Sequence, residues 1–285
     1  MERKHFLERL EHDNDYQREY IKAEKFCSEV RMTSDMYNSI NEFISQNFWK
    51  WEDRSTFSSF EELREYMGFK VETDKGRRCF AATEVDMNGY FSFCEMILTL
   101  VFALNWKLDS NLHEVRDAMI KTMQAVIAKA GFEIKETGRE VQIVQQNAVA
   151  SDVADKVEPV LAEKIIEYNH YLLRGNIEKK KQILKQITDA LEPKRAELRQ
   201  IQYRETEDYF NLVNNMNIRH NNLDPKDTKR FNHQFSTMTP DEQESWYDLI
   251  YEQALGLFVA LEQQDRNKRI DKYRQSERST EEKKN

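Results

Sequence analysis

Apolar residues recur at intervals of three and four along most of this chain, which is the spacing of one face of an α-helix. In the first half, the pattern predicts helices over 2–31, 33–48, 58–68, 90–106 and 110–131. The fourth of these is the most apolar stretch, yet it is shorter than the ~20 residues of a membrane span and carries Glu95. We therefore expect a buried helix that pairs with the next one, and no membrane insertion.

Small polar residues and glycines mark the expected helix ends. Thr33 or Ser34 can cap the second helix, and Ser58 or Ser59 can cap the third. Gly68 and Gly131 follow the third and fifth helices, where a left-handed backbone conformation commonly ends a helix.

Alternation with a period of two occurs convincingly at one place, near 132–145. Phe132 and Ile134 precede a turn, and Val141 and Ile143 follow it, which predicts a β-hairpin. A lone hairpin is marginally stable, so we expect it to pack against helices. The stretch at 70–84 is polar and gives no comparable signal.

The second half is again helical by pattern. One stripe consists of Val153, Val157, Leu161, Ile165 and Leu172 and is broken at 174–176. The next helix carries Ile177, Leu184, Leu191 and Leu198, spaced seven apart, with Pro193 expected to kink or end it. A third helix covers 205–218, and a last one begins at Pro240 with Thr239 as its cap.

These elements predict an all-α fold of helical bundles with one small β-hairpin near 132–145. We expect an N-terminal helical region with the hairpin at 1–147, a helical bundle at 148–264, and a charged tail at 265–285. The tail has eight basic and five acidic residues and almost no apolar ones, which is typical of a solvated segment.

Composition and charge narrow the possible partners. The 285 residues include only 7 Gly and 4 Pro, and the net charge is -8, so no overall positive field attracts nucleic acid or anionic lipid. Any phosphate binding must be local. Three widely spaced cysteines indicate neither disulfides nor zinc, and residues 1–20 lack an apolar signal segment, so we expect a cytoplasmic protein.

Motifs for metal and nucleotide chemistry are missing from the sequence: it has no HExxH, EF-hand, GxxxxGK[ST] or GxGxxG pattern. We therefore predict no metal and no cofactor. An aromatic cluster is present and consists of Phe48, Trp49, Trp51, Phe57 and Phe60. Such clusters are usually core, but this one could stack bases if it is exposed beside positive charge.

The segment NNMNIRHNN at 214–222 has five asparagines around Arg219 and His220. Asparagine is favoured at helix ends and disfavoured inside helices, so capping accounts for several of them. Three interpretations of the arginine and histidine stay open. They belong to a buried polar junction that satisfies helix ends, to a site that binds RNA or a phosphate, or to a surface that binds a protein partner.

Four stretches together resemble a bacterial family of abortive-infection, HEPN-like helical proteins: EYNHYLLRGNIEKKKQIL, LEPKRAEL, FNLVNNMNIRHNN and ESWYDLIYEQALGLFVAL. The resemblance covers roughly 130–262. It implies phage defence or a toxin-related role, and for many members a metal-independent ribonuclease with an R-x4-6-H motif. Arg219 followed by His220 matches the opening of that motif. Its closing histidine would fall at position 224, 225 or 226, and these positions are Asp224, Pro225 and Lys226.

On this hypothesis Arg219 stabilises charge on the phosphate and His220 acts as the base, roles that metal-free RNA cleavage requires. We expect the binding residues to be Asn217, Asn221, Asn222, His170 and Lys180. RNA is the first expected partner. The alternative is a noncatalytic helical interaction module or regulatory subunit, whose partner is another protein or a second copy of the chain.

Overall fold

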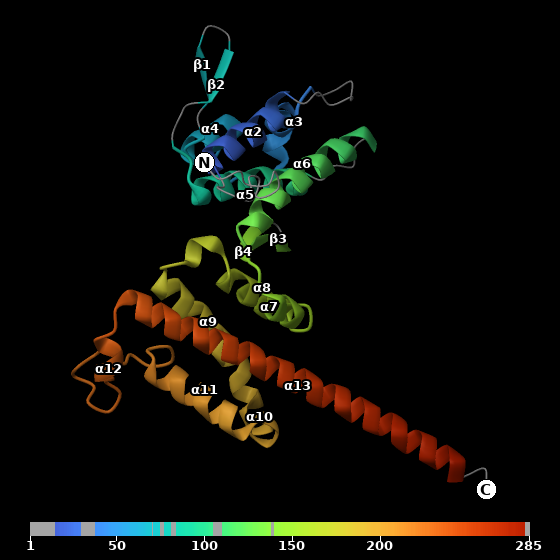
Figure 1. Cartoon of the computed structure of the whole chain (residues 1–285), viewed down its shortest axis with the longest axis vertical. Helices are drawn as coiled ribbons and strands as arrows, with labels where there is room; N and C mark the ends of the chain where they lie inside the picture. The colour runs from blue at the N-terminus through green and yellow to red at the C-terminus, as the bar shows by residue number, and fades with distance from the viewer. Residues whose placement is uncertain are drawn as a thin grey trace, which may run out of the picture. The chain divides into compact units, whose positions relative to one another are not determined.

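A computed structural model describes residues 15–29, 38–69, 71–74, 77–80, 84–104, 110–137 and 140–282. The chain divides into two compact units, residues 1–146 and 147–285. The division falls beside the boundary that the sequence predicts between 147 and 148. Each unit is described by itself below (Figure 1).

The first unit contains helices and two short hairpins (Figure 1). Its helical elements are α2 (Tyr16–Glu29), α3 (Ile40–Asn47), η1 (Phe48–Lys50), α4 (Phe60–Tyr66), α5 (Met87–Ala103) and α6 (Ser110–Lys129). Its strands are β1 (Val71–Asp74), β2 (Arg77–Phe80), β3 (Phe132–Thr137) and β4 (Glu140–Gln145). Together with the second unit, this confirms an all-α fold with a small β-hairpin.

Helix α5 lies in the centre of this unit, as its apolar sequence predicts. Phe91, Cys94 and Leu98 are completely buried in it. No helix of the described residues is both long and apolar enough to cross a membrane. Helix α5 contacts α6, which confirms the expected pairing.

The predicted hairpin forms between β3 and β4, with Ile134 opposite Ile143. It packs on α5, and Glu95 of that helix accepts a 2.6 Å hydrogen bond from the amide of Ile143. The amide of Val141 donates to the Thr99 hydroxyl at 2.9 Å. The polar residues of an otherwise apolar helix thus satisfy backbone groups of the strand beside it.

Two sequence expectations in this unit need correction. The cap of α3 is Ser39, whose side chain accepts from the Glu42 amide, so the expected caps Thr33 and Ser34 do not start that helix and lie outside the described residues. A second hairpin, β1–β2, occupies part of the stretch that gave no β signal. By contrast, Ser59 caps α4 and Gly68 follows it at φ 84°, as expected.

A buried ion pair holds α2 against α4. The guanidinium of Arg64 donates two 3.0 Å hydrogen bonds to the carboxylate of Glu24, and the two side chains are 6% and 0% exposed. Asn41 of α3 donates to the same carboxylate at 3.1 Å. Two charged groups are tolerated here because each is paired and hydrogen-bonded.

The described residues of the second unit form helices joined by loops, with no strand among their elements. Its elements are α7 (Ala148–Ala154), α8 (Pro159–Tyr168), η2 (Tyr171–Leu173), α9 (Ile177–Leu191), η3 (Glu192–Lys194), α10 (Arg195–Ile201), α11 (Tyr203–Asn215), α12 (His233–Ser236) and α13 (Pro240–Glu282). One apolar core joins them, with Leu184, Leu191 and Leu198 completely buried in it. Pro193 ends α9 as predicted, since η3 separates α9 from α10.

The stripe expected from Val153 to Leu172 is not one helix. Pro159 stands at the first turn of α8, where it lacks an amide hydrogen, so α7 and α8 are separate helices. Leu172 falls in η2 and its side chain is 52% exposed, so it is not a core residue. Ile165 is fully buried as expected.

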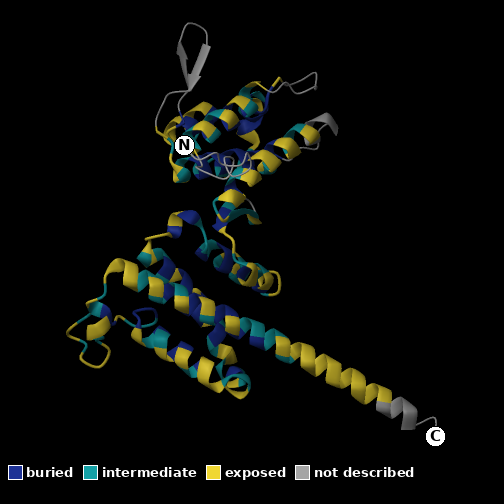
Figure 2. Cartoon of the chain, viewed as in Figure 1, coloured by how far each residue is buried: buried dark blue, intermediate teal, exposed yellow. Residues whose placement is uncertain are grey.

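Helix α13 is 43 residues long and begins with a capping box. The Thr239 amide donates to Glu242 Oε2 at 2.8 Å, and the Glu242 amide donates to Thr239 Oγ1 at 3.3 Å. The helix continues through the segment expected to be a charged tail, which is exposed over 265–277 but helical (Figure 2).

Candidate functional site

The asparagine-rich segment forms a turn that leaves the end of α11. The Met216 amide closes the helix by donating to the carbonyl of Leu212 at 2.8 Å. Asn217 then adopts φ 59°, in the left-handed region that asparagine tolerates better than most residues. The chain reverses at this point because the left-handed residue cannot continue the helix.

Two of the asparagines hold the turn closed by pairing with each other. The Asn217 amide donates to Asn222 Oδ1 at 2.9 Å, and the Asn222 amide donates to Asn217 Oδ1 at 3.2 Å. Asn222 Nδ2 also donates to the carbonyl of Arg230 at 2.6 Å. Both side chains are buried, Asn222 to 1% exposure, so these bonds satisfy groups that water does not reach.

A third asparagine, Asn232, ties the far end of the loop to α11. Its Nδ2 donates to the carbonyl of Asn215 at 2.9 Å, and its backbone amide donates to the carbonyl of Asn222 at 2.9 Å. Its Oδ1 also accepts from the Phe235 amide and caps α12. By contrast, Asn221 is exposed and only closes a local turn with the Leu223 amide at 3.2 Å.

Arg219 lies on the outside of this junction, partly open to solvent. Its Nη1 is 2.9 Å from Glu192 Oε2 of η3, and the two side chains are 28% and 39% exposed. Glu192 Oε2 has no well-aligned hydrogen bond despite this short distance, so the contact is an ion pair and not a bidentate fork. The pair links the end of α9 to the turn after α11.

His220 is half-buried beside two arginines. Burial lowers the pKa of His220 below its usual value of 6.5, and the charges of Arg230 and Arg219 lower the pKa further, while Asp227 raises it. This shift favours the neutral imidazole. A neutral imidazole can accept a proton, which is the property that a general base needs.

Residues 223–231, which we name the cationic loop, present positive charge next to this pair. Lys226, Lys229 and Arg230 are exposed, and none forms an ion pair with a carboxylate in the described part of the chain. The two acids of the loop, which are half-buried, each accept a hydrogen bond from the backbone amide two residues further on: Asp224 from the Lys226 amide at 2.9 Å and Asp227 from the Lys229 amide at 3.3 Å. The loop thus carries local positive charge on a chain of net charge -8.

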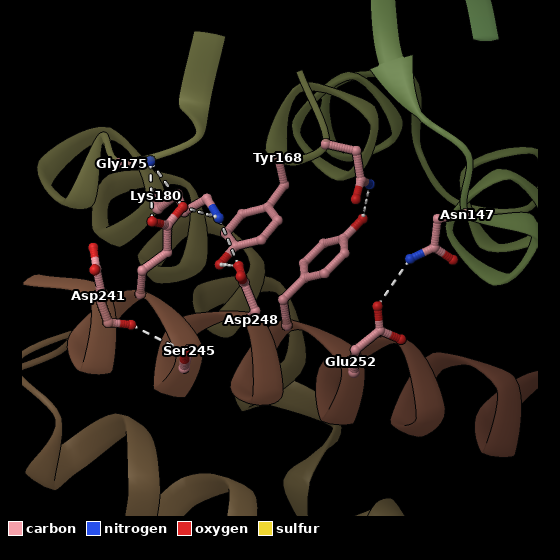
Figure 3. Close-up of polar contacts among 11 residues, drawn as sticks. Asn147, Tyr168, Gly175, Lys180, Asp241, Ser245, Asp248 and Glu252 are labelled. Carbon is pink, nitrogen blue, oxygen red and sulfur yellow. Dashed lines mark hydrogen bonds and ion pairs between the residues drawn. The ribbon is translucent and has the colours of Figure 1, made fainter. Parts of the chain in front are cut away.

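Lys180, which the sequence placed among the binding residues, lies in a different environment. Its Nζ is 2.7 Å from both Glu244 Oε1 and Asp248 Oδ1 of α13, and it lies 5.1 Å from the ring centre of Tyr168 (Figure 3). Its side chain is only 8% exposed. The ammonium therefore joins α9 to α13 and is not presented to a phosphate in solution.

The carboxylates around Lys180 have further partners. The Gly175 amide donates to both oxygens of Glu244, at 2.9 and 3.0 Å, and Tyr168 Oη donates to Asp248 at 2.9 Å (Figure 3). Burial alone would raise the pKa of Glu244, but Lys180 and the Gly175 amide outweigh it and hold the pKa below 4.5. These contacts fix the α8–α9 connection on the start of α13.

His170 belongs to the same connection. Its Nδ1 accepts from the Leu172 amide at 3.2 Å and caps η2, and its ring lies 4.6 Å from the ring of Tyr171. The structure thus separates the predicted residues into two groups. Arg219, His220 and Asn217, Asn221 and Asn222 share the loop after α11, whereas His170 and Lys180 stabilise helix packing.

The aromatic cluster of the first unit is divided between core and surface. Phe48 and Phe60 are buried at 1% exposure, whereas Trp49 is 65% exposed with Lys50 Nζ 5.5 Å from its ring centre. Arg54 Nη1 donates to the Trp49 carbonyl at 2.6 Å, and Glu52 and Asp53 in the same segment balance the charges of Lys50 and Arg54, so residues 49–54 carry no net positive charge. The electrostatics do not favour a base-stacking platform here.

Comparison with known proteins adds no assignment: no family model matches this sequence, and neither a curated protein nor a solved structure matches it significantly. The resemblance to HEPN-like proteins accordingly stays a prediction. The basic residues of the cationic loop could have been found from the sequence. The absence of carboxylate partners could not be, because it depends on contacts with the rest of the unit.

Proposed function

We propose that this protein binds single-stranded RNA through its phosphates, at the cationic loop and the adjoining Arg219 and His220. The observation that supports the proposal is the set of three exposed cations without carboxylate partners in the described residues, Lys226, Lys229 and Arg230. Unpaired surface cations attract phosphate because binding releases counterions and breaks no existing ion pair.

The framework of the loop suits such a role. Asn222 holds the Arg230 carbonyl and the Asn217 amide together, so the backbone is ordered before a ligand arrives. A ligand then meets a preformed set of charges and less binding energy is spent on ordering the chain. Arg219 is paired with Glu192 through Nη1, and its side chain stays 28% exposed to solvent.

Cleavage is a further step that the resemblance implies and that His220 could perform. In this reaction the neutral imidazole takes the proton of a ribose 2′-hydroxyl, and the 2′-oxygen forms a bond to phosphorus. The bond from phosphorus to the 5′-oxygen breaks, and that oxygen takes a proton from water. Arg219 stabilises the negative charge that develops on the phosphoryl oxygens. The defence or toxin-related role rests on the resemblance alone.

A noncatalytic interaction module is the second candidate, and one observation favours it. Asn217, Asn222 and the Arg219–Glu192 pair already have structural roles in the turn, as a buried polar junction requires. On this alternative, the loop has the same structure but no affinity for RNA. The two candidates therefore differ in a direct binding measurement.

The test is fluorescence anisotropy of a labelled single-stranded RNA with the full-length protein, without added metal. Lys229→Glu with Arg230→Glu should weaken binding at least about tenfold and reduce the salt slope by about 0.7 for each phosphate that is no longer neutralised. The control is Lys185→Glu with Arg204→Glu, which makes the same change of net charge at exposed sites on α9 and α11.

His220→Ala separates binding from cleavage on the same RNA, because a base is required only for the chemical step. We expect this variant to retain RNA and to lose any metal-independent cleavage that the wild type shows. Wild-type protein without affinity at low salt, or equal weakening in the loop variant and its control, would reject the proposal and leave the interaction module.

A further inference from the structure

The C-terminal half of α13 extends beyond the core of its own unit. Residues 265–277 are all exposed (Figure 2), and the last described contact with another helix is the 2.9 Å ion pair between Lys268 and Glu197 of α10. Figure 1 shows the helix continuing past α10 and α11 as a single rod. We name residues 265–277 the arm.

Contacts inside the arm are weak supports for an isolated helix. Arg266 pairs with Glu262 at 2.6 Å, and Tyr273 Oη donates to Glu277 at 2.6 Å, each one turn apart. Such pairs contribute only about 0.2–0.5 kcal/mol each to a helix. Most helical stability in proteins comes instead from the packing of an apolar face, which the described contacts of the arm do not provide.

Two large apolar side chains nevertheless stand exposed on the arm. Ile270 is 43% exposed and Tyr273 is 63% exposed, and they lie three residues apart on one face. The same face has Arg266 four residues before Ile270 and Glu277 four residues after Tyr273. Intervals of four, three and four are the spacing of a coiled-coil seam.

We propose that the arm pairs with the arm of a second copy of this protein, in antiparallel orientation. The intervals read the same in both directions, while the charges at the two ends are opposite. An antiparallel copy centred between Asp271 and Lys272 therefore brings Arg266 opposite the partner's Glu277, and Ile270 opposite the partner's Tyr273. This proposal does not depend on RNA binding.

Charge decides the orientation. In a parallel pair in register, each Arg266 would oppose a second arginine and each Glu277 a second glutamate, and like charges at a seam are unfavourable. In the antiparallel pair, opposite charges meet at both ends of the seam, and the two contacts between Ile270 and the partner's Tyr273 remove apolar surface from water. No partner of uniform charge matches a seam that is basic at one end and acidic at the other.

The pairing must be reversible because it is short. The seam from Arg266 to Glu277 is only about 17 Å long at 1.5 Å per residue. The surface area that it can bury is therefore much smaller than that of most stable interfaces. We therefore expect a mixture of monomer and dimer that shifts with concentration. The monomer mass is 34.2 kDa, so the dimer has twice that mass.

Sedimentation equilibrium of the full-length protein over a range of concentrations is the first test. Arg266→Glu and Glu277→Arg, each alone, should shift the protein to monomer, and the two together should restore the dimer because the opposite charges face each other again. Lys272→Glu, at an exposed position of the arm that points away from the seam, is the matched control and should retain the dimer. Circular dichroism checks that every variant keeps its helix.

Disulfide trapping then tests the orientation. Under mild oxidation, an equal mixture of the Ile270→Cys and Tyr273→Cys proteins, one of them carrying a mass tag, should form mainly the mixed disulfide. Wild type is the control, and its Cys27 and Cys94 are buried. Wild-type protein that stays monomeric, a double variant that is not restored, or crosslinks confined to identical copies would each overturn the proposal.

Discussion

Replacing Asn222 with alanine should destabilise the second unit strongly, because this side chain satisfies two backbone groups at once. Its Oδ1 accepts from the Asn217 amide at 2.9 Å, and its Nδ2 donates to the Arg230 carbonyl at 2.6 Å. Alanine removes both partners and leaves the backbone groups in place. The Asn217 residue is only 4% exposed, so its amide has little access to water.

The magnitude follows from those two bonds. A buried donor or acceptor left without a partner costs about 1–3 kcal/mol, and the Arg230 carbonyl, on an exposed residue, should lie at the low end of that range. We therefore expect a decrease of about 2–4 kcal/mol in unfolding free energy. For a unit of this size, that corresponds to a decrease of about 6–12 °C in melting temperature.

The neighbouring asparagine supplies a matched control. Asn221 is exposed and contacts only the Leu223 amide, so Asn221→Ala should change stability by no more than about 0.5 kcal/mol. Urea unfolding followed by circular dichroism measures both variants under the same conditions. If Asn222→Ala unfolded within about 0.5 kcal/mol of Asn221→Ala, the account of the turn as a buried polar junction would be refuted.

Three further predictions concern charged and titrating groups. Lys180→Met should lower the unfolding free energy by about 2–4 kcal/mol, because the Glu244 carboxylate, 15% exposed, loses its cation. Lys185→Met, on the exposed side of α9, should change the unfolding free energy little, and equal effects of the two variants in thermal melts would contradict the structural role of Lys180. The pKa of Glu244 is below 4.5 in the folded protein, so the unfolded chain binds more protons and stability should fall as the pH drops below 4.5. The pKa of His220 is below 6.5 in the folded protein, so stability should likewise fall as the pH drops through 6.5. In a curve of unfolding free energy against pH, measured with denaturant, His220→Gln should flatten the part near pH 6.5 and Glu244→Gln the part below pH 4.5. Unchanged slopes would contradict the lowered pKa values of these two groups.

Local signals in the sequence located many helix ends correctly. Ser59, Gly68 and the Thr239–Pro240 pair each act on backbone groups within a few residues, so their effect does not depend on the rest of the fold. The hairpin at 132–145 was equally predictable, since its alternation and turn lie in one short segment.

Some elements escaped prediction because their local signals were ambiguous or absent. The stripe from Val153 to Leu172 keeps a helical period through Pro159, and periodicity alone does not register that a proline starts a new helix there. Ser39 caps α3 although Thr33 and Ser34 offered the same chemistry earlier in the chain. The β1–β2 pairing lacks an alternating apolar pattern in its sequence.

The helical class of this protein, the buried position of α5 and the concentration of asparagines after α11 can all be read from the sequence, because they follow from composition and from periods of a few residues. What the polar residues do depends on the folded arrangement. Lys180 and Lys185 lie on the same helix, yet only Lys180 meets two carboxylates of α13. Asn221 and Asn222 are adjacent, yet only Asn222 is buried and reaches the Arg230 carbonyl. Such differences arise from contacts between segments that are distant in the sequence. These contacts depend on how the helices pack, so the periodicity of the sequence does not predict them.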